Sequence, residues 1–202
     1  MVDLFFQLGL TVAIAYIIGS IPTGYLIVKS KTGDDIRKIG SGSTGATNVK
    51  RVLGKKWFFI TLLLDAFKGV LPVVLAKLFV TAGASIGLAP VIAAVAVIIG
   101  HSKSCFLNFQ GGKSVASGVG TILALNFLVG ALIAVIWGAI TYTTKYVSVG
   151  SIIALLISPF LMFFFHAPIA YVCYCALGAI YIVYLHRENI KRLIAGNENK
   201  VR

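Results

Sequence analysis

Long apolar stretches follow one another along almost the whole chain, and they constrain the fold more than any other feature. They lie at residues 4–28, 57–80, 84–100, 119–142, 147–165 and 168–185. A helix needs about 20 apolar residues to cross a hydrocarbon core of about 30 Å. The runs are continuous and do not alternate with polar residues, which argues against a β-barrel. We therefore predict an all-α fold, a polytopic membrane helical bundle in which residues 1–202 form a single integral-membrane domain.

The charges beside the first run predict which side of the membrane each end occupies. Asp3 precedes this run, whereas Lys29 and Lys31 follow it. Positively charged residues favour the cytoplasmic side. We therefore expect an uncleaved first span with the N-terminus outside and residues 29–56 in the cytoplasm.

Counting crossings from that start predicts seven helices. Residues 101–118 would return to the cytoplasm, and the basic tail, residues 186–202, would also lie there. Residues 113–144 must then cross twice or not at all, and 32 residues are too few for two full-length spans. Two short helices, broken near residues 126–130, would satisfy the count. We favour seven crossings, with the fourth and fifth short, over six.

The chain is strongly basic, with 18 Lys and Arg against six Asp and Glu. These positive charges lie between apolar runs, so orientation in the membrane explains most of them and nucleic acid is not expected as a partner. An anionic ligand or anionic lipid headgroups could account for a second part. The three cysteines and the scattered carboxylates lack metal-site spacing, so we expect no metal and no cofactor. The sequence does not indicate an oligomeric state.

The first polar segment, "KIGSGSTGATNVKRVLGKK", spans residues 38–56. Its glycines let the backbone turn tightly, and Ser41, Thr47 and Asn48 supply small hydrogen-bonding groups. Arg51 follows Thr47 by four residues, so a helix would place both on one face. This composition is typical of an anion site at a helix N-terminus, although a flexible loop that sets topology would look similar. We take Thr47, Asn48 and Arg51 as candidate phosphate ligands.

The second segment, "NFQGGKSVASGVG", also has the composition of a phosphate site. Gly111 and Gly112 precede Lys113, and an apolar helix is expected to begin near Ser114. The spaced glycine of a Walker loop is absent. Backbone N–H groups at a helix start together with an ammonium group nevertheless suit a phosphate.

The third segment, "HRENIKRL", begins at His186. On a helix, Asn189 lies three residues after His186 on the same face, and Glu188 can pair with Arg192. A helix leaving the membrane with an interfacial histidine would show the same spacing.

One apolar run contains two charged residues of opposite sign, which can pair with each other. Asp65 and Lys68 stand three residues apart in residues 57–80. Charged groups in a span usually face the bundle interior or water, so we expect a structural ion pair near the site.

Together these segments resemble one family, the bacterial membrane acyl-phosphate:glycerol-3-phosphate acyltransferases. The matching stretches are "GSGSTGATNVKR" (residues 40–51), "GGKSVAS" (111–117) and "HRENIKRL" (186–193), with "LDAFKG" (64–69) and "GSIPTGYL" (19–26) in support. The resemblance covers essentially the whole chain in order.

The resemblance implies an enzyme that transfers a fatty acyl group from acyl phosphate to the C1 hydroxyl of glycerol 3-phosphate. The products would be 1-acyl-glycerol 3-phosphate (lysophosphatidate) and phosphate, in the first acylation of phospholipid synthesis. It also implies a seven-helix bundle in the bacterial inner membrane with a cytoplasmic site. The family's functional residues correspond to Ser41, Arg51, Gly111, Gly112, Lys113, Ser148, His186 and Asn189. Of these, we expect Ser41, His186 and Asn189 to be catalytic.

Several positions depart from the family's usual pattern. Ser43 stands where Asn is usual, Gln110 where Lys is common, and Ser114 where Gly is usual. The Cβ of Ser114 is expected to narrow the phosphate loop, which affects fine geometry and rate but not the reaction.

Two other functions fit part of the pattern. A transporter or flippase for a phosphorylated solute would also need a basic, glycine-rich site, but such sites commonly lie near the membrane midplane. A lipid-binding scaffold explains the basic loops but not the glycines.

Overall fold

The computed structural model describes residues 2–80 and 87–201, and helices are the only regular secondary structure there. The α-helices are α1 (Val2–Ser20), α2 (Thr23–Thr32), α3 (Ala46–Leu53), α4 (Lys55–Phe79), α5 (Leu88–Ser102), α6 (Val115–Leu125), α7 (Phe127–Thr144), α8 (Val147–Phe164), α9 (Ile169–Leu185) and α10 (Arg187–Ile194). Two 3-10 turns, η1 (Ile36–Lys38) and η3 (Cys105–Leu107), lie between them. The predicted all-α fold is confirmed. Residues 84–86, at the start of the third predicted run, lie outside the described residues.

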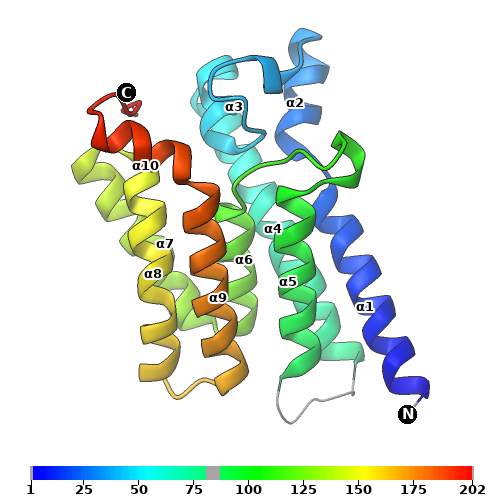
Figure 1. Ribbon diagram of the computed structural model, residues 1–202. Coiled ribbons are helices and arrows are strands. Elements are labelled where there is room, and N and C mark those ends of the chain that lie inside the picture. Colours follow the sequence, from blue (N-terminus) through cyan, green and yellow to red (C-terminus); the bar gives the residue numbers. More distant parts are fainter. Residues whose placement is uncertain (1, 81–86, 202) are drawn as a thin grey trace.

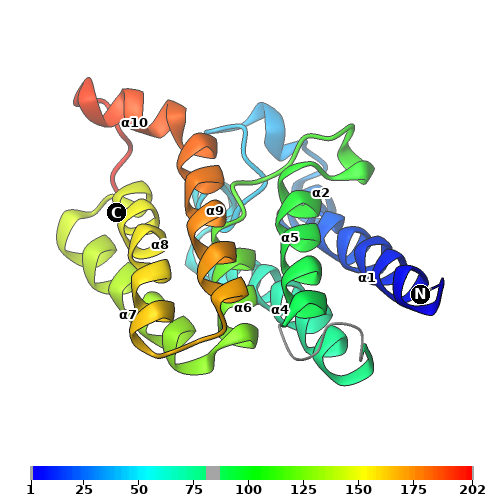
Figure 2. The ribbon, with the colours of Figure 1, turned by 60° about the horizontal axis from the view of Figure 1, so that its bottom comes forward.

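The long helices lie side by side in one bundle (Figure 1). Helix α1 packs on α5, α4 on α6, α7 on α8, and α8 on α9. Figure 2 shows α1 at one edge of the bundle and α7 with α8 at the other. Helices α2, α3 and α10 gather at one end, where the tail also lies, while α1 begins at the opposite end. The chain therefore traverses the bundle an odd number of times, as the predicted count requires.

Five stretches of the described chain are long and apolar enough to cross a membrane. They are Leu4–Thr32, Lys55–Phe79, Leu88–Leu107, Phe127–Thr144 and Val147–Phe164. Helix α9 reaches that length only together with α10, from which it is bent by 60°.

Helix α6 is the shortest of the described helices that pack along the length of the bundle. Its 11 residues extend only about 16 Å, against a hydrocarbon core of about 30 Å. At its end, Lys77 in the last turn of α4 donates hydrogen bonds to the carbonyls of Ala124 and Leu125. A break at Asn126 then starts α7, because the Asn126 side chain accepts from the N–H of Val129. The short fourth helix and the break are confirmed, but α7 has 18 residues, so the expectation of a short fifth helix is wrong.

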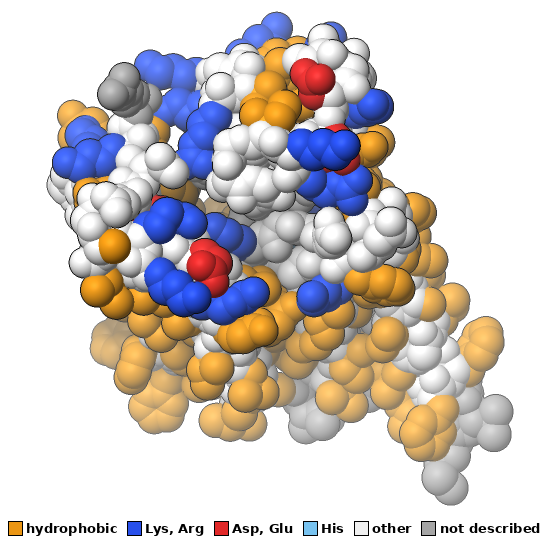
Figure 3. Space-filling model, turned by 45° about the horizontal axis from the view of Figure 1, so that its top comes forward, with side chains coloured by type: hydrophobic (Ala, Val, Ile, Leu, Met, Phe, Trp, Pro, Cys, Tyr) orange, Lys and Arg blue, Asp and Glu red, His pale blue; other side chains and the backbone are white. Residues whose placement is uncertain are grey.

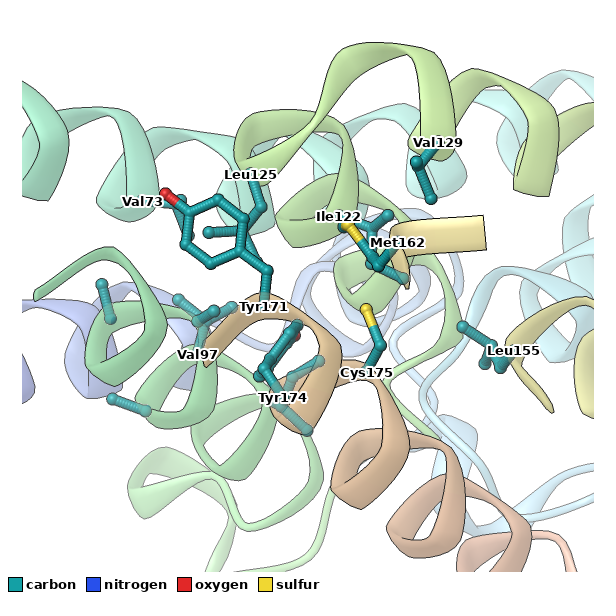
Figure 4. Close-up of a cluster of buried hydrophobic side chains, with 14 of the residues drawn as sticks. Val73, Val97, Ile122, Leu125, Val129, Leu155, Met162, Tyr171, Tyr174 and Cys175 are labelled. Atoms are coloured by element: carbon teal, nitrogen blue, oxygen red, sulfur yellow. The ribbon is translucent and has the colours of Figure 1, made fainter. Parts of the chain in front are cut away.

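The core of the bundle lies between α4, α5, α6, α8 and α9. Figure 4 shows its apolar side chains pointing toward one another, including Val73, Ile122, Met162 and Tyr174. Helices α4 and α6 approach closely because Gly120 leaves room for the backbone of Ala66, where an added Cβ would meet the carbonyl oxygen at 2.1 Å. This close contact fixes the middle of α6 against the middle of α4, beside the polar groups described next.

The two ends of the bundle differ in charge. Figure 3 shows lysine and arginine side chains gathered over the end that carries α2, α3 and α10, with hydrophobic side chains covering the flanks below. Apolar flanks of this kind suit contact with lipid, and the basic end suits contact with water and anionic groups.

Candidate active site

A cavity that is open to solvent lies at the basic end of the bundle. Its walls come from the loop before α3, from α3, α4, the end of α5, the start of α6, α7, the start of α8, the α9–α10 bend and the tail. Eight of the predicted site residues line it: Ser41, Thr47, Asn48, Arg51, Lys113, Ser148, His186 and Asn189. Gly111 and Gly112 are not among the lining residues. The three polar segments therefore meet at one site, as the sequence predicts.

Asn48 organises the first segment. Its buried side-chain amide donates hydrogen bonds to the carbonyls of Ile39 at 2.9 Å and Ser43 at 3.0 Å. Its Oδ1 accepts from the backbone N–H of Ser41 at 3.1 Å. The left-handed φ of Gly40, +61°, lets the loop turn over this side chain. Asn48 thus holds the loop that presents Ser41 to the cavity.

Helix α3 presents Thr47 and Arg51 on one face, one turn apart, and both line the cavity. This is the arrangement that their spacing predicts. Arg51 brings a permanent positive charge, whose planar donors suit phosphate oxygens.

Lys113 connects the second segment to the third. Its Nζ donates a hydrogen bond to Oδ1 of Asn189. Burial lowers the pKa of Lys113 to about 8, helped by the positive charges of Arg192 and Arg51 and opposed by Glu198. The ammonium is therefore still mostly charged at pH 7, and it stands ready for a second anion.

Glu198, in the C-terminal tail, binds side chains of the third segment and of α8. It was not predicted from the sequence. Its carboxylate accepts hydrogen bonds from Ser148 at 2.9 Å, Asn189 at 2.6 Å and Arg192 at 2.7 Å. Burial acts to raise the pKa of Glu198, but these hydrogen bonds outweigh it and the pKa is lowered. Arg192 pairs with Glu198, so the predicted pairing with Glu188 is wrong. The one available signal was that Glu198 is the only acid in residues 189–202.

His186 stands at the bend between α9 and α10 and is buried. Its Nδ1 lies 2.8 Å from the carbonyl of Ile182, so Nδ1 carries the proton. Nε2 of the neutral ring is then an acceptor. The bend of 60° turns Asn189, three residues later, into the same cavity.

The predicted ion pair of Asp65 and Lys68 is confirmed, with 2.9 Å between Nζ and Oδ1. Lys68 also donates to the carbonyl of Ile21 at 2.7 Å, in the break between α1 and α2, where the N–H of Thr23 donates to the same carbonyl. Thr23 donates to Asp65 at 2.7 Å. Asp65 lines the cavity, so this pair borders the site.

Comparison with known proteins decides the family. Residues 9–196 match the family model described as glycerol-3-phosphate acyltransferase.

The chain belongs to the glycerol-3-phosphate acyltransferase family.

Curated members of the family match almost the full length. The glycerol-3-phosphate acyltransferase of Nostoc sp. (strain PCC 7120) is 41% identical over 206 residues, covering 96% of this chain and 91% of the relative. That of Rippkaea orientalis is 43% identical over 203 residues, covering 96% and 92%. The predicted family is therefore confirmed, and with it an enzyme that acylates glycerol 3-phosphate.

Solved structures give the same result for the fold. A crystal structure of PlsY (YgiH), described as an integral membrane glycerol 3-phosphate acyltransferase in its glycerol 3-phosphate form, matches with a TM-score of 0.90 at 34% identity. The match covers 96% of both chains. A lysophosphatidic acid form of PlsY matches with a TM-score of 0.88 at 33% identity. The chain is thus an integral membrane acyltransferase.

Ser114, which departs from the family's usual glycine, adopts a glycine-like backbone. Its φ is +59°, in the left-handed region. A residue with a side chain pays about 1–2 kcal/mol for that conformation. The hydroxyl of Ser114 donates to the carbonyl of Ile98 at 2.9 Å, which offsets about 1 kcal/mol of this strain. The side chain is therefore tied to α5, although Ser114 still lines the cavity.

Ser43, a second departure, takes part in the loop that Asn48 holds. Its hydroxyl accepts from the N–H of Gly45 at 3.3 Å just before α3 begins. The third departure, Gln110, is exposed and does not line the cavity.

Proposed function

We propose that this acyltransferase takes acyl phosphate as its donor and transfers the acyl group to the C1 hydroxyl of glycerol 3-phosphate. The single observation that supports this most strongly is the charge of the cavity. Arg51, Lys113 and Arg192, from three separate segments, line it together with the carboxylates of Glu198 and Asp65, and Asp65 is paired with Lys68. More than one cation is what two phosphate-bearing substrates require.

The glycerol 3-phosphate and lysophosphatidic acid forms of PlsY support the acceptor and the product. Both molecules carry a phosphate, and the second carries an acyl chain as well. Apolar side chains also line the cavity in this chain, among them those of Phe58, Leu62, Trp137 and Val147. We assign the first carbons of the acyl chain to these apolar side chains and the phosphates to the cationic ones.

In the proposed reaction, the C1 oxygen of glycerol 3-phosphate attacks the acyl carbonyl carbon. A new carbon–oxygen ester bond forms, and the bond between the acyl carbon and the phosphate oxygen breaks. The hydroxyl proton passes to the departing phosphate, so the products are 1-acyl-glycerol 3-phosphate and inorganic phosphate. Phosphate is a good leaving group, so the protein acts mainly by positioning and by charge neutralisation.

Each residue has a stated part in this scheme. Arg51 and Lys113 hold the two phosphates, with Thr47 and Ser148 beside them. Ser41, His186 and Asn189 orient the reacting hydroxyl and carbonyl. Asn48 acts through the loop that it holds.

We also propose where the enzyme operates. The basic end of the bundle would face the bacterial cytoplasm across the inner membrane, as the positive-inside rule favours (Figure 3). The C-terminus would then be cytoplasmic and the N-terminus outside. Residues 1–202 would act as a single membrane domain.

Purified protein in detergent tests this proposal directly. Acyl phosphate and glycerol 3-phosphate are supplied together, and released phosphate and the acylated product are measured. We expect equal amounts of both, no product with acyl-CoA as donor, and no reaction above the spontaneous rate when glycerol 3-phosphate is omitted. Turnover with acyl-CoA alone would refute the assigned donor. A trapped acyl group on Ser41 would refute direct transfer.

A further inference from the structure

The two glycines before Lys113 do not occupy the position that a phosphate loop would give them. Gly111 and Gly112 are absent from the cavity lining, and the N–H of Gly112 donates to the carbonyl of His101 at 3.1 Å. That N–H is therefore not free for a phosphate. Something other than direct contact with the ligand must explain two consecutive glycines here.

Backbone conformation does not explain them either. In this loop the left-handed φ values belong to Asn108 (+53°), Phe109 (+59°) and Ser114 (+59°), none of which is glycine. Neither Gly111 nor Gly112 has a φ in that region. Other residue types could adopt their backbone angles, so the requirement must come from space.

The space is taken by one residue, His101 in the last turn of α5. A Cβ added to Gly112 would lie 2.2 Å from Nε2 of the His101 ring. A Cβ added to Gly111 would lie 2.1 Å from the His101 carbonyl oxygen. Contacts this short are impossible, so the loop backbone rests directly on the ring and on the carbonyl of His101.

The ring of His101 is itself held from the other side. Its Nδ1 lies 3.0 Å from the hydroxyl of Ser117 in the first turn of α6. It lies 3.8 Å from Oδ1 of Asp65, which is fixed by Thr23 and Lys68. The ring therefore joins α4, α5 and α6 to the loop, and His101 is buried between them, at the wall of the cavity.

We propose that His101 is a positioning residue for the phosphate site. Its ring and carbonyl form the support on which the residue 111–112 backbone rests, and this support places the ammonium of Lys113 in the cavity. The glycines are required because they fit against His101, not because they touch the substrate. This inference rests on the proposed role of Lys113 in holding a phosphate.

A double-mutant experiment tests whether Gly112 is required because it fits against the His101 ring or because it contacts the substrate. Gly112→Ala should raise the KM for glycerol 3-phosphate by about tenfold while changing kcat less, because the methyl group displaces the loop from the ring. His101→Ala removes the ring and makes room for that methyl. In the His101→Ala background, Gly112→Ala should therefore change the KM by less than about threefold.

Gly111→Ala is the matched control. Its added methyl meets the carbonyl of His101, which His101→Ala leaves in place. This substitution should raise the KM by the same factor in both backgrounds. Equal effects of Gly112→Ala in both backgrounds would overturn the proposal, because the glycine would then act on the ligand or on another neighbour.

A second background and a second measurement cover variants that do not fold. His101→Asn keeps a polar side chain beside Ser117 and is shorter than histidine, so the same rescue is expected in it. The chain has only three histidines, so the ring ¹⁵N signals of labelled protein can be resolved without ligand. Gly112→Ala should shift the His101 signal and Gly111→Ala should shift it less. An unchanged His101 signal in Gly112→Ala would also overturn the proposal.

The proposed function is judged separately. If the wild-type protein does not turn over acyl phosphate, that function fails. Equilibrium binding of glycerol 3-phosphate then replaces the KM in the same double-mutant comparison, and the inference about His101 stands or falls on the coupling alone.

Discussion

We expect the activity of the enzyme to fall at alkaline pH as Lys113 loses its proton. Its pKa is lowered to about 8, so raising the pH from 7 to 9 removes most of the positive charge from this side chain. A lysine elsewhere on the surface would stay charged over that range. Guanidinium groups in general stay charged over that range, and the pKa of Glu198 is lowered, so its carboxylate is already ionised. Lys113 is thus the group near the phosphates whose charge changes in this interval.

The size of the effect follows from that pKa. If only the charged form binds substrate productively, kcat/KM falls by about tenfold between pH 7 and pH 9, since the charged fraction falls from about nine in ten to about one in ten. The parameter kcat/KM reports the free enzyme, so bound phosphate does not mask this pKa. The acceptor phosphate itself loses its second proton near pH 6 and stays a dianion throughout.

The assay is phosphate release at limiting glycerol 3-phosphate, corrected at each pH for spontaneous hydrolysis of acyl phosphate. Lys113→Arg is the matched variant because a guanidinium stays charged well beyond pH 9. Its kcat/KM should be lower at pH 7 and nearly flat up to pH 9. A wild-type profile without the alkaline fall, or the same fall in Lys113→Arg, would show that this lysine does not govern substrate binding.

Three further outcomes are expected. Ser114→Ala should lower the free energy of unfolding by about 1 kcal/mol, because the hydrogen bond to Ile98 is lost and the backbone strain remains. Ser114→Gly loses both the hydrogen bond and the strain, so its free energy of unfolding should be nearly unchanged. Thermal unfolding in detergent measures the difference. Glu198→Gln should reduce kcat/KM by about tenfold or more, because it weakens charge-assisted hydrogen bonds within the site, while Glu188→Gln on the exposed face should have an effect of about twofold at most. His186→Ala should impair kcat in a protein that still elutes as a folded species, and normal turnover would remove His186 from the site.

The parts of the site that follow local spacing could be predicted from the sequence. Thr47 and Arg51 share a helix face, and Asp65 pairs with Lys68, because side chains three or four residues apart on a helix are neighbours whatever the tertiary fold. The meeting of three distant segments was predicted from their location on one side of the membrane. Polar segments at the ends of membrane spans must lie at the membrane surface, so segments on the same side lie close together.

The parts that depend on the path of the chain in space could not be predicted. Arg192 has two acids within reach, and the course of the tail brings Glu198 to it while Glu188 pairs with Lys191. The glycines of the second segment were interpreted by composition, and their contact with His101 exists only after α5 and the loop have packed together. The unequal division of residues 113–144 depends on Asn126 ending one helix and starting the next.

The short helix α6 determines how deep the chemistry lies. Its C-terminal end is level with the last turn of α4, where Lys77 reaches it, and its first residues form the floor of the cavity. That floor therefore lies about 16 Å from that far end, because α6 has only 11 residues. In the proposed reaction, the acyl chain would remain among lipid tails while its activated carboxyl end meets the water-soluble acceptor at this floor. The lipid-soluble donor and the water-soluble acceptor would then react without either leaving its own solvent.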